Sequence, residues 1–317
     1  MSTQTRVIRA NGRNSPIVQP RSSEGLELIY FDVLRLSRGE ERTLDVPGVE
    51  VHLVPLSGRM DVQIDSQSFT NVGGRDSVWD GKADSVYAGS GAPIRVRART
   101  DLELAVAGGV TDGQFEPFRV PPEEVHYVEV GSPETKSRRR ICHLLGQNAA
   151  GRAGNLLVSE LYADEGCWSG YPPHKHDMDR SEADENGVDR LVETNHEELY
   201  HFRYRPESGF GAQFIYRDGE QPHVEMIRNG DSALIPGGFH PTVTSPGHEE
   251  YIFTVLVGRT RRGLVQHFEP AHLHLIDRIP GIAGMRKAFE CVIDSTPEYR
   301  LSNLWSWLWR QRPTKPV

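Results

Sequence analysis

Short stretches rich in β-branched and aromatic residues dominate the first third of the chain, and several alternate between apolar and polar positions. Alternation with a period of two is typical of a strand that buries one face. Residue pairs such as Pro47-Gly48 and Asp80-Gly81 separate these stretches with turn chemistry. The pattern predicts strands over Glu27–Leu36, Val49–Leu56, Met60–Ile64, Ile94–Ala98 and Leu102–Ala107.

A second group of short strands follows further along the chain. They are predicted over Asn155–Tyr162, Leu199–Arg205, Ala212–Tyr216, His223–Ile227, Ser232–Ile235 and Tyr251–Val257. Two successive groups of evenly spaced strands predict an all-β protein with two jelly-roll (double-stranded β-helix) modules in tandem. The Pro- and Glu-rich stretch Phe115–Lys136 predicts their junction. We expect an N-terminal arm over 1–24, modules over 25–125 and 126–280, and a tail over 281–317.

Two segments fall outside the strand pattern. Asp177–Asn195 is polar and acidic, and predicts a long loop inserted in the second module. The tail between Met285 and Trp309 has apolar residues at helical spacing, namely Leu301, Leu304, Trp305 and Leu308. We expect a short helix there that packs on the body or joins the subunits of a homo-oligomer.

Composition and charge narrow the class of protein. The chain has 317 residues and a net charge of −8, without a basic stripe, so nucleic acid is not an expected partner. No run of about 18 apolar residues occurs, so a membrane span is not expected either. The beginning of the chain lacks the apolar run of a signal peptide. Cys142, Cys167 and Cys291 are odd in number and widely spaced, which favours free thiols in a reducing cytoplasm.

The candidate chemistry lies in the second module, in the segment Tyr171-Pro-Pro-His174-Lys-His176-Asp177. In an extended segment, His174 and His176 point to the same side. Pro236-Gly-Gly-Phe-His240 adds a tight turn followed by a third histidine. Three imidazoles and one carboxylate, with positions left open, are typical of a catalytic site for one divalent ion.

Three carboxylates compete for the fourth ligand position: Glu193, Glu197 and Glu198. If Glu198 faces the barrel interior, the aromatic side chains of the same strand face it too. If Glu197 faced inward, a histidine and two arginines would be buried there without compensation, at a high desolvation cost. We therefore expect Glu198 to be the ligand.

The sequence leaves two possible roles open for each of two further polar residues, Lys175 and Arg75. Lys175, between the two histidines, should point to the opposite face; it is either a substrate contact or a surface or intersubunit lysine. Arg75 follows two glycines, and either reaches a carboxylate bidentately or belongs to a surface turn. The first module has no equivalent set of histidines, so we expect a metal-free copy. Because the loop Asp177–Asn195 begins and ends beside predicted ligands, we expect it to gate the site.

At these residues the chain resembles the 5-deoxy-glucuronate isomerases of inositol catabolism, relatives of 5-keto-4-deoxyuronate isomerase in the bicupin superfamily. The resemblance covers about Gly25 to His274. The segments that carry the resemblance are Gly73-Gly-Arg75-Asp-Ser-Val-Trp79-Asp-Gly81, Gly166-Cys-Trp168-Ser-Gly-Tyr171-Pro-Pro-His-Lys-His-Asp177, Glu197-Glu-Leu-Tyr-His-Phe and Pro236-Gly-Gly-Phe-His240-Pro241.

The resemblance implies the aldose–ketose isomerisation of a deoxy-uronic acid, with His174, His176, Glu198 and His240 as metal ligands. Zinc is the first expectation for the ion, with manganese, iron and nickel as alternatives, because all accept this ligand set. Two rival functions use the same site: an iron-dependent dioxygenase and a non-catalytic protein that binds sugar acids. The expected catalytic or substrate contacts are Tyr200, Tyr171 and Gln213, with Arg75 or Arg139 for the substrate carboxylate.

Overall fold

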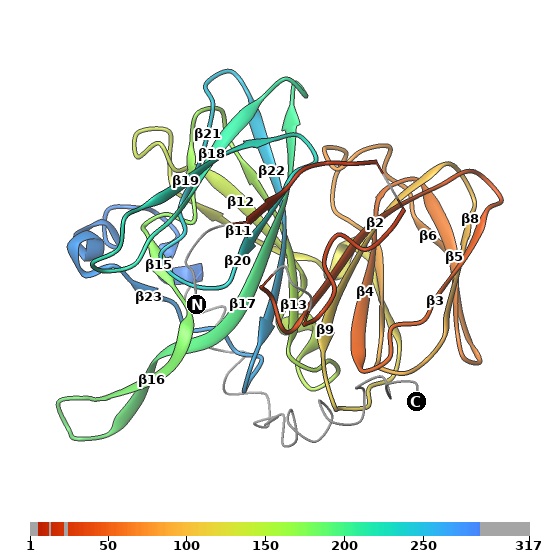
Figure 1. The fold of residues 1–317 in the computed structure, drawn as a ribbon, viewed down its shortest axis with the longest axis horizontal. Coiled ribbons are helices and arrows are strands. Elements are labelled where there is room, and N and C mark those ends of the chain that lie inside the picture. The colour runs from red at the N-terminus through yellow and green to blue at the C-terminus, as the bar shows by residue number, and fades with distance from the viewer. Residues whose placement is uncertain (1–5, 13, 22–24, 286–317) are drawn as a thin grey trace, which may run out of the picture.

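The computed structural model describes residues 6–12, 14–21 and 25–285, and strands dominate it (Figure 1). The first module holds a five-stranded sheet of order β10-β7-β4-β9-β2 and a four-stranded sheet of order β3-β8-β5-β6. Its strands are β2 (Ile29–Leu36), β3 (Glu41–Leu44), β4 (Val49–Ser57), β5 (Arg59–Ile64), β6 (Gln67–Gly73), β7 (Ser85–Ala88), β8 (Ile94–Ala98), β9 (Leu102–Val110) and β10 (Phe118–Val120).

The second module is larger. Its main sheet has the order β1-β20-β17-β22-β13-β12-β11, with β16 paired to β17; β14-β21-β18-β19 form a second sheet and β15-β23 a small third one. The strands are β1 (Arg6–Ile8), β11 (His126–Val130), β12 (Arg139–Leu145), β13 (Leu156–Ala163), β14 (Trp168–Ser169), β15 (His174–Lys175), β16 (Asp177–Ala183), β17 (Asp189–Arg205), β18 (Phe210–Ile215), β19 (His223–Arg228), β20 (Ser232–Ile235), β21 (Thr242–Thr244), β22 (Glu249–Gly258) and β23 (His267–Phe268). The described residues also hold three short 3-10 helices, η1 (Pro122–Glu124), η2 (Gln147–Ala149) and η3 (Pro270–Leu275), and residues 282–285 are α-helical.

The all-β class predicted from the sequence is confirmed, and each predicted strand overlaps an observed one. The sheets change over between β10 and β11, within the predicted junction Phe115–Lys136. The prediction missed several short strands, among them β6, β7 and β10: β6 is mostly polar, and β7 and β10 have only four and three residues, too few to show a period.

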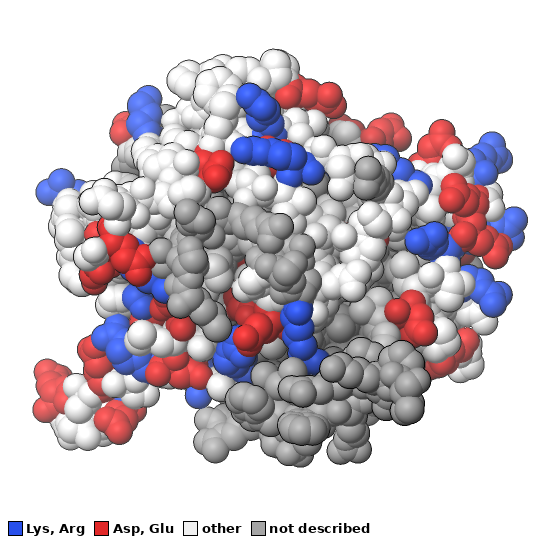
Figure 2. All heavy atoms as spheres, in the orientation of Figure 1, with Lys and Arg blue, Asp and Glu red and all other residues white. Residues whose placement is uncertain are grey.

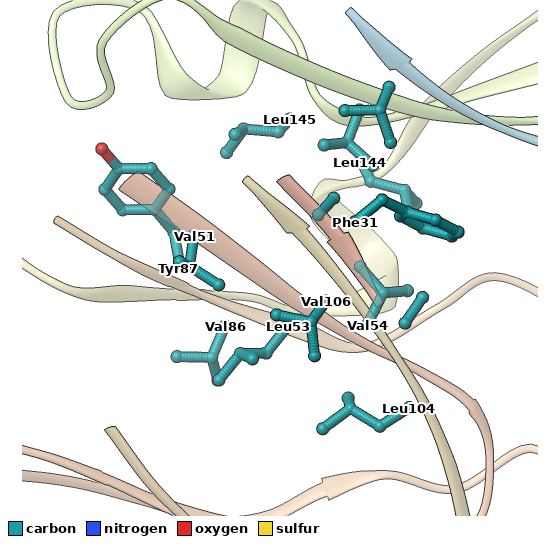
Figure 3. Packing of buried hydrophobic residues seen from close by; sticks show 14 of the residues in the cluster. Phe31, Val51, Leu53, Val54, Val86, Tyr87, Leu104, Val106, Leu144 and Leu145 are labelled. Atoms are coloured by element: carbon teal, nitrogen blue, oxygen red, sulfur yellow. The ribbon is translucent and has the colours of Figure 1, made fainter. Parts of the chain in front are cut away.

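The two modules share one hydrophobic core. The main sheet of the second module packs against the five-stranded sheet of the first, and both contribute to one core cluster (Figure 3). That cluster contains Phe31 of β2 together with Leu144 and Leu145 of β12. The Phe31 ring lies 5.4 Å from the His201 ring and 5.8 Å from the Phe253 ring. The interface is therefore a continuous apolar core rather than a contact between two finished surfaces.

Alternation along β17 divides its side chains between two interiors. Leu199 belongs to the core shared with the first module, whereas Tyr200, Phe202 and Tyr204 belong to a separate core inside the second module. Because successive side chains of a strand point to opposite faces, one strand supplies both cores. This explains why β17 is buried almost continuously from Thr194 onwards although its sequence contains many polar residues.

The N-terminal arm does not form a separate unit. β1 pairs antiparallel with β20, with Arg6 opposite Leu234. The arm then continues to the first module, where Val18 forms an isolated bridge with Phe31. The segment predicted as an arm thus adds an edge strand to the second module and contacts both modules.

The segment Asp177–Asn195 was expected to be a loop, and that prediction is wrong. β16 pairs with the first part of β17 as a hairpin, with Asp177 opposite Asn195 and Ala183 opposite Asp189. The hairpin extends away from the body (Figure 1) rather than over the barrel, and acidic side chains gather towards its end (Figure 2). Charged residues on both faces removed the apolar alternation that would have revealed these strands.

The remaining expectations concern charge, thiols and the tail. Figure 2 shows acidic and basic side chains interspersed on the visible face of the first module. Cys142 and Cys167 are buried free thiols. No helix in the described part of the chain is long and apolar enough to span a membrane. The predicted tail helix and Cys291 lie outside the described residues.

Arg75 lies at the boundary of the modules and not on the surface. Its guanidinium pairs with Glu160 of β13, and both side chains are almost fully buried, with relative exposures of 6% and 0%. Arg75 also donates to the carbonyls of Pro55 and Gly81, both at 3.2 Å. Tyr251 donates to the Glu160 carboxylate at 2.8 Å. The prediction of a surface turn is wrong, whereas the alternative that Arg75 reaches a carboxylate bidentately is borne out, with Glu160 as the partner in an ion pair between the modules.

Replacing Arg75 should destabilise the protein strongly. In the variant Arg75→Met the Glu160 carboxylate stays buried without its cation, which costs about 3–5 kcal/mol. The half-exposed Arg97, 3.8 Å from Glu41, provides the control, and Arg97→Met should cost at most about 1 kcal/mol. Urea unfolding of the three proteins measures both, and equal midpoints for the two variants would contradict the assignment.

Candidate metal centre

Three potential metal ligands converge inside the second module. His176 follows β15, Glu198 lies on the inward face of β17, and His240 lies between β20 and β21. The Nε2 atoms of His176 and His240 are each 3.1 Å from the same oxygen, Oε2 of Glu198. All three side chains are buried, with relative exposures of 1–4%. Segments distant in sequence therefore bring two imidazoles and one carboxylate to a single point.

Of the three competing carboxylates, Glu198 is the one that faces the two imidazoles. Glu197 points the other way, accepting hydrogen bonds from the Glu27 and Leu28 amides and pairing with Arg259. Glu193 pairs with Lys175 at the base of the hairpin. β17 is a regular strand through this region, so its side chains alternate strictly between the two faces.

The imidazole orientations suit metal binding. In each of His174, His176 and His240 the Nδ1 atom faces a backbone carbonyl oxygen, of Pro172 at 3.0 Å, of His196 at 3.1 Å and of Gly238 at 2.8 Å respectively. A carbonyl can only accept, so each Nδ1 carries the proton and each Nε2 is the atom available as a ligand. Metal-binding histidines almost always donate their second nitrogen in this way.

The charge distribution requires a positive charge between these groups. Burial alone would raise the pKa of Glu198, but the hydrogen bonds and charges of His176 and His240 lower it well below its usual range. Burial lowers the pKa of His176, but the hydrogen bond to Glu198 outweighs this and raises it overall. Two nitrogen lone pairs cannot face one carboxylate oxygen without a proton or a cation between them. The donor set therefore fits a divalent ion.

His174 lies beside this cluster without joining it in the described geometry. Its ring centroid is 5.0 Å from that of His240 and 6.3 Å from that of His176. Its Nε2 atom is 2.9 Å from the Nε2 atom of Gln266. Burial and the two neighbouring imidazoles lower the pKa of His174 well below its usual value. His174 is thus neutral and adjacent, as a fourth ligand must be.

A tight turn presents His240, and Asp177 holds it. Gly237 and Gly238 have φ of +149° and +88°, and a Cβ on Gly237 would lie 2.8 Å from the Asp177 Cβ. The Gly238 amide donates to Asp177 Oδ2 at 2.9 Å. Gln213 donates to the His240 carbonyl at 2.9 Å, while its Oε1 has no partner among the described residues. Gln213 therefore holds His240 through the His240 carbonyl. Asp177, the last residue of the histidine motif, holds the same turn through the Gly238 amide.

The structure brings Tyr200 and Arg139 into the same interior. The Tyr200 ring lies 6.2 Å from the His240 ring, and the Tyr200 side chain is buried near the Glu198 charge. Burial and the Glu198 charge raise the pKa of Tyr200 well above its usual value, so it keeps its proton.

Arg139 is buried and donates to the carbonyls of Ser137 at 2.8 Å and Tyr171 at 2.6 Å. No carboxylate among the described residues pairs with it.

Lys175 does not point to the ligand cluster. Its ammonium group is 2.7 Å from Asp177 Oδ1 and 2.9 Å from Glu193 Oε1. The alternation argument predicted this orientation. With two carboxylates already bound, the predicted substrate contact of Lys175 is replaced by an ion-pair cluster that fixes the base of the β16–β17 hairpin.

Two contributions were missed from the sequence. No role was assigned to Asp177 from the sequence, although its position directly after His176 indicated that it lies next to the ligands. Gln266 had no signal, since it lies in an irregular segment that reaches His174 only through the pairing of β15 with β23.

A model of the KduI/IolB family matches residues 4–275. The chain belongs to the KduI/IolB family. It is 31% identical over 283 residues to a 5-deoxy-glucuronate isomerase of Lacticaseibacillus casei, covering 88% of this chain and 96% of that relative. It is 34% identical over 246 residues to the 5-deoxy-glucuronate isomerase of Geobacillus thermodenitrificans, covering 77% and 85%.

Solved structures agree with this membership. An IolB-like protein from Salmonella typhimurium LT2 superposes with a TM-score of 0.74 at 30% identity, covering 85% of this chain and 98% of that one. A point mutant of Bacillus subtilis oxalate decarboxylase superposes with a TM-score of 0.50 at 12% identity, covering 76% and 71%. The second likeness shows the shared cupin fold alone. Membership of the KduI/IolB family makes this chain an enzyme of the isomerase class.

Metal analysis tests the ligand assignment directly. The protein purified without chelators should carry one divalent ion per chain, and His176→Ala should lose most of it. Lys175→Ala is the matched control because it neighbours His176 but faces Asp177 and Glu193; it should retain the ion. Two ions per chain, none at all, or equal losses in both variants would refute the assignment.

Proposed function

We propose that this protein is a metal-dependent aldose–ketose isomerase that converts 5-deoxy-glucuronate to 2-deoxy-5-keto-gluconate in inositol catabolism. The observation that supports it most is the convergence of His176, Glu198 and His240, with their hydrogen-bond partners set for metal binding, in the interior that also holds Arg139. The names of the relatives favour this particular acid. Inositol catabolism would place the protein in the cytoplasm, with zinc the first ion to test.

Four side chains would hold the ion: His174, His176, Glu198 and His240. When bound, a divalent ion polarises a carbonyl and the adjacent hydroxyl, which acidifies the carbon between them. The residues fit this group because every Nδ1 proton is already donated to a carbonyl, leaving the three Nε2 lone pairs and the carboxylate for coordination. A carboxylate among the ligands also lowers the net positive charge of the site.

Arg139 is the residue that would bind the substrate carboxylate. Burial lowers its pKa to about 10, so it is still protonated at neutral pH. A buried guanidinium held only by backbone carbonyls keeps uncompensated positive charge, which an anionic substrate can neutralise. The planar fork of arginine also matches a carboxylate bidentately. The structure favours Arg139 over Arg75, whose charge is already compensated by Glu160.

Tyr200 would act next to the reacting carbons. It is buried near the Glu198 charge, and its raised pKa keeps it protonated. In that state its hydroxyl can donate a hydrogen bond to a substrate oxygen that gains negative charge. Gln213 would keep the His240 turn in place, and Tyr171 would hold Arg139 through its carbonyl oxygen.

Conversion of the candidate acid is the primary test. With the metal-loaded protein, NMR of 5-deoxy-glucuronate should show new ketone carbon signals. In deuterated water, solvent deuterium at the carbon that gains hydrogen would indicate proton transfer, and its absence a hydride shift. If a panel of deoxy-uronates and uronates stays unchanged while the metal is bound, the isomerase proposal fails. Oxygen consumption with iron would then indicate a dioxygenase, and tight binding without turnover a binding protein.

The carboxylate contact has its own test. Arg139→Lys should raise the KM by roughly 10- to 100-fold, the size of one charge-assisted hydrogen bond worth about 1.5–3 kcal/mol. Arg140→Lys is the matched control, because Arg140 lies next on the same strand but is exposed and stacks over the Tyr162 ring at 4.8 Å. Urea unfolding of both variants checks that the fold is intact. An unchanged KM in Arg139→Lys would assign the carboxylate to another residue.

A further inference from the structure

Gln266 lies at the edge of the metal centre, just before β23. This strand places Phe268 opposite His174, and the two rings are 5.5 Å apart. The Glu269 amide donates to the Pro173 carbonyl at 2.9 Å. The segment is thus attached to the histidine motif at two further points, so Gln266 remains beside His174 whatever its own side chain binds.

The tautomer of His174 determines how Gln266 meets it. His174 donates its Nδ1 proton to the Pro172 carbonyl, and its Nε2 atom faces an amide nitrogen, which can only donate, so Nε2 carries a lone pair. The Gln266 amide nitrogen, 2.9 Å away, therefore donates to it. The opposite amide orientation would set an oxygen lone pair against a nitrogen lone pair. In the described structure, then, a carboxamide occupies the atom that a metal ion would need.

The other end of the same carboxamide lacks a partner. Gln266 Oε1 is buried, and no described residue donates a hydrogen bond to it. Buried polar atoms are nearly always satisfied, so an unsatisfied one beside a ligand cluster indicates a missing partner. His174 is also the one predicted ligand that stands outside the close group of His176, Glu198 and His240.

We propose that the Gln266 carboxamide exchanges partners. It caps His174 in the metal-free protein, and it binds an oxygen of the sugar-acid substrate once His174 holds the ion. A single Nε2 lone pair cannot serve an amide N–H and an ion together, so metal binding releases the N–H next to the coordination sphere. The substrate class in this inference rests on the proposed function.

The chemistry of the side chain identifies the group it would bind. A carboxamide offers N–H donors and one carbonyl acceptor, and a sugar hydroxyl both donates and accepts. A hydroxyl bound there satisfies the amide N–H and the orphaned Oε1 together. Gln266 would therefore select acids that carry a hydroxyl beside the carbon pair that reacts, and would discriminate against analogues deoxygenated at that carbon.

Zinc affinity tests the first half without any turnover. In chelator competition, Gln266→Met should bind zinc roughly two- to tenfold more tightly than the wild type, because one competing hydrogen bond is removed. Gln63→Met is the control, since Gln63 is exposed on β5 and donates only to the Asp65 carbonyl; its affinity should not change. Weaker or unchanged zinc binding by Gln266→Met would overturn the exchange and leave Gln266 as a support for His174.

Substrate affinity tests the second half. In zinc-loaded proteins, Gln266→Met should raise the Kd for D-glucuronate, measured by calorimetry, about tenfold. It should raise the KM for 5-deoxy-glucuronate by a similar factor, which is the upper range for one hydrogen bond. Equal affinities in variant and wild type would overturn the substrate contact. If the wild type converts no acid, the proposed function fails, while the zinc and glucuronate measurements still decide this inference.

Discussion

The geometry of the metal centre depends on the alternation of β17, a strand whose two faces belong to different cores. Glu198 and Tyr200 face the barrel of the second module, and Leu199 faces the first module. A slip of one residue would exchange every side chain between the two interiors, setting a leucine against the imidazoles. Packing from both sides resists that slip. The first module therefore contributes to the site without supplying a ligand, by holding the far face of the strand that does.

Sequence periodicity was sufficient to predict a strand and its inward face wherever every second side chain had to be apolar. It located the strands and selected Glu198, because only one phase of β17 leaves its arginines outside the barrel. It failed for the hairpin formed by β16 and the start of β17, whose two faces are both solvated and so leave no alternation to detect. The pattern of one strand likewise does not say whether its outer face meets water or another sheet, and His201 is buried for this reason.

The roles of Arg75 and Arg139 could not be separated from the sequence, because the difference lies in what each guanidinium meets after folding. Arg75 meets Glu160, and its charge is neutralised within the protein. Arg139 meets only carbonyl oxygens, and its charge is left for something else. Local sequence carries no record of such long-range pairing. The same limit explains Gln266, which reaches His174 from 92 positions away.

The pairing of β1 with β20 has a consequence for the order in which the chain assembles during synthesis. Arg6 leaves the ribosome early but has no partner until Leu234 emerges, roughly 10–50 s later at about 5–20 residues per second. The first module can complete its sheets in that interval, whereas the second keeps β20 as an open edge until the waiting arm attaches. An unpaired edge is where foreign strands add. A segment that precedes the first module in the chain thus covers an edge of the sheet that carries Glu198.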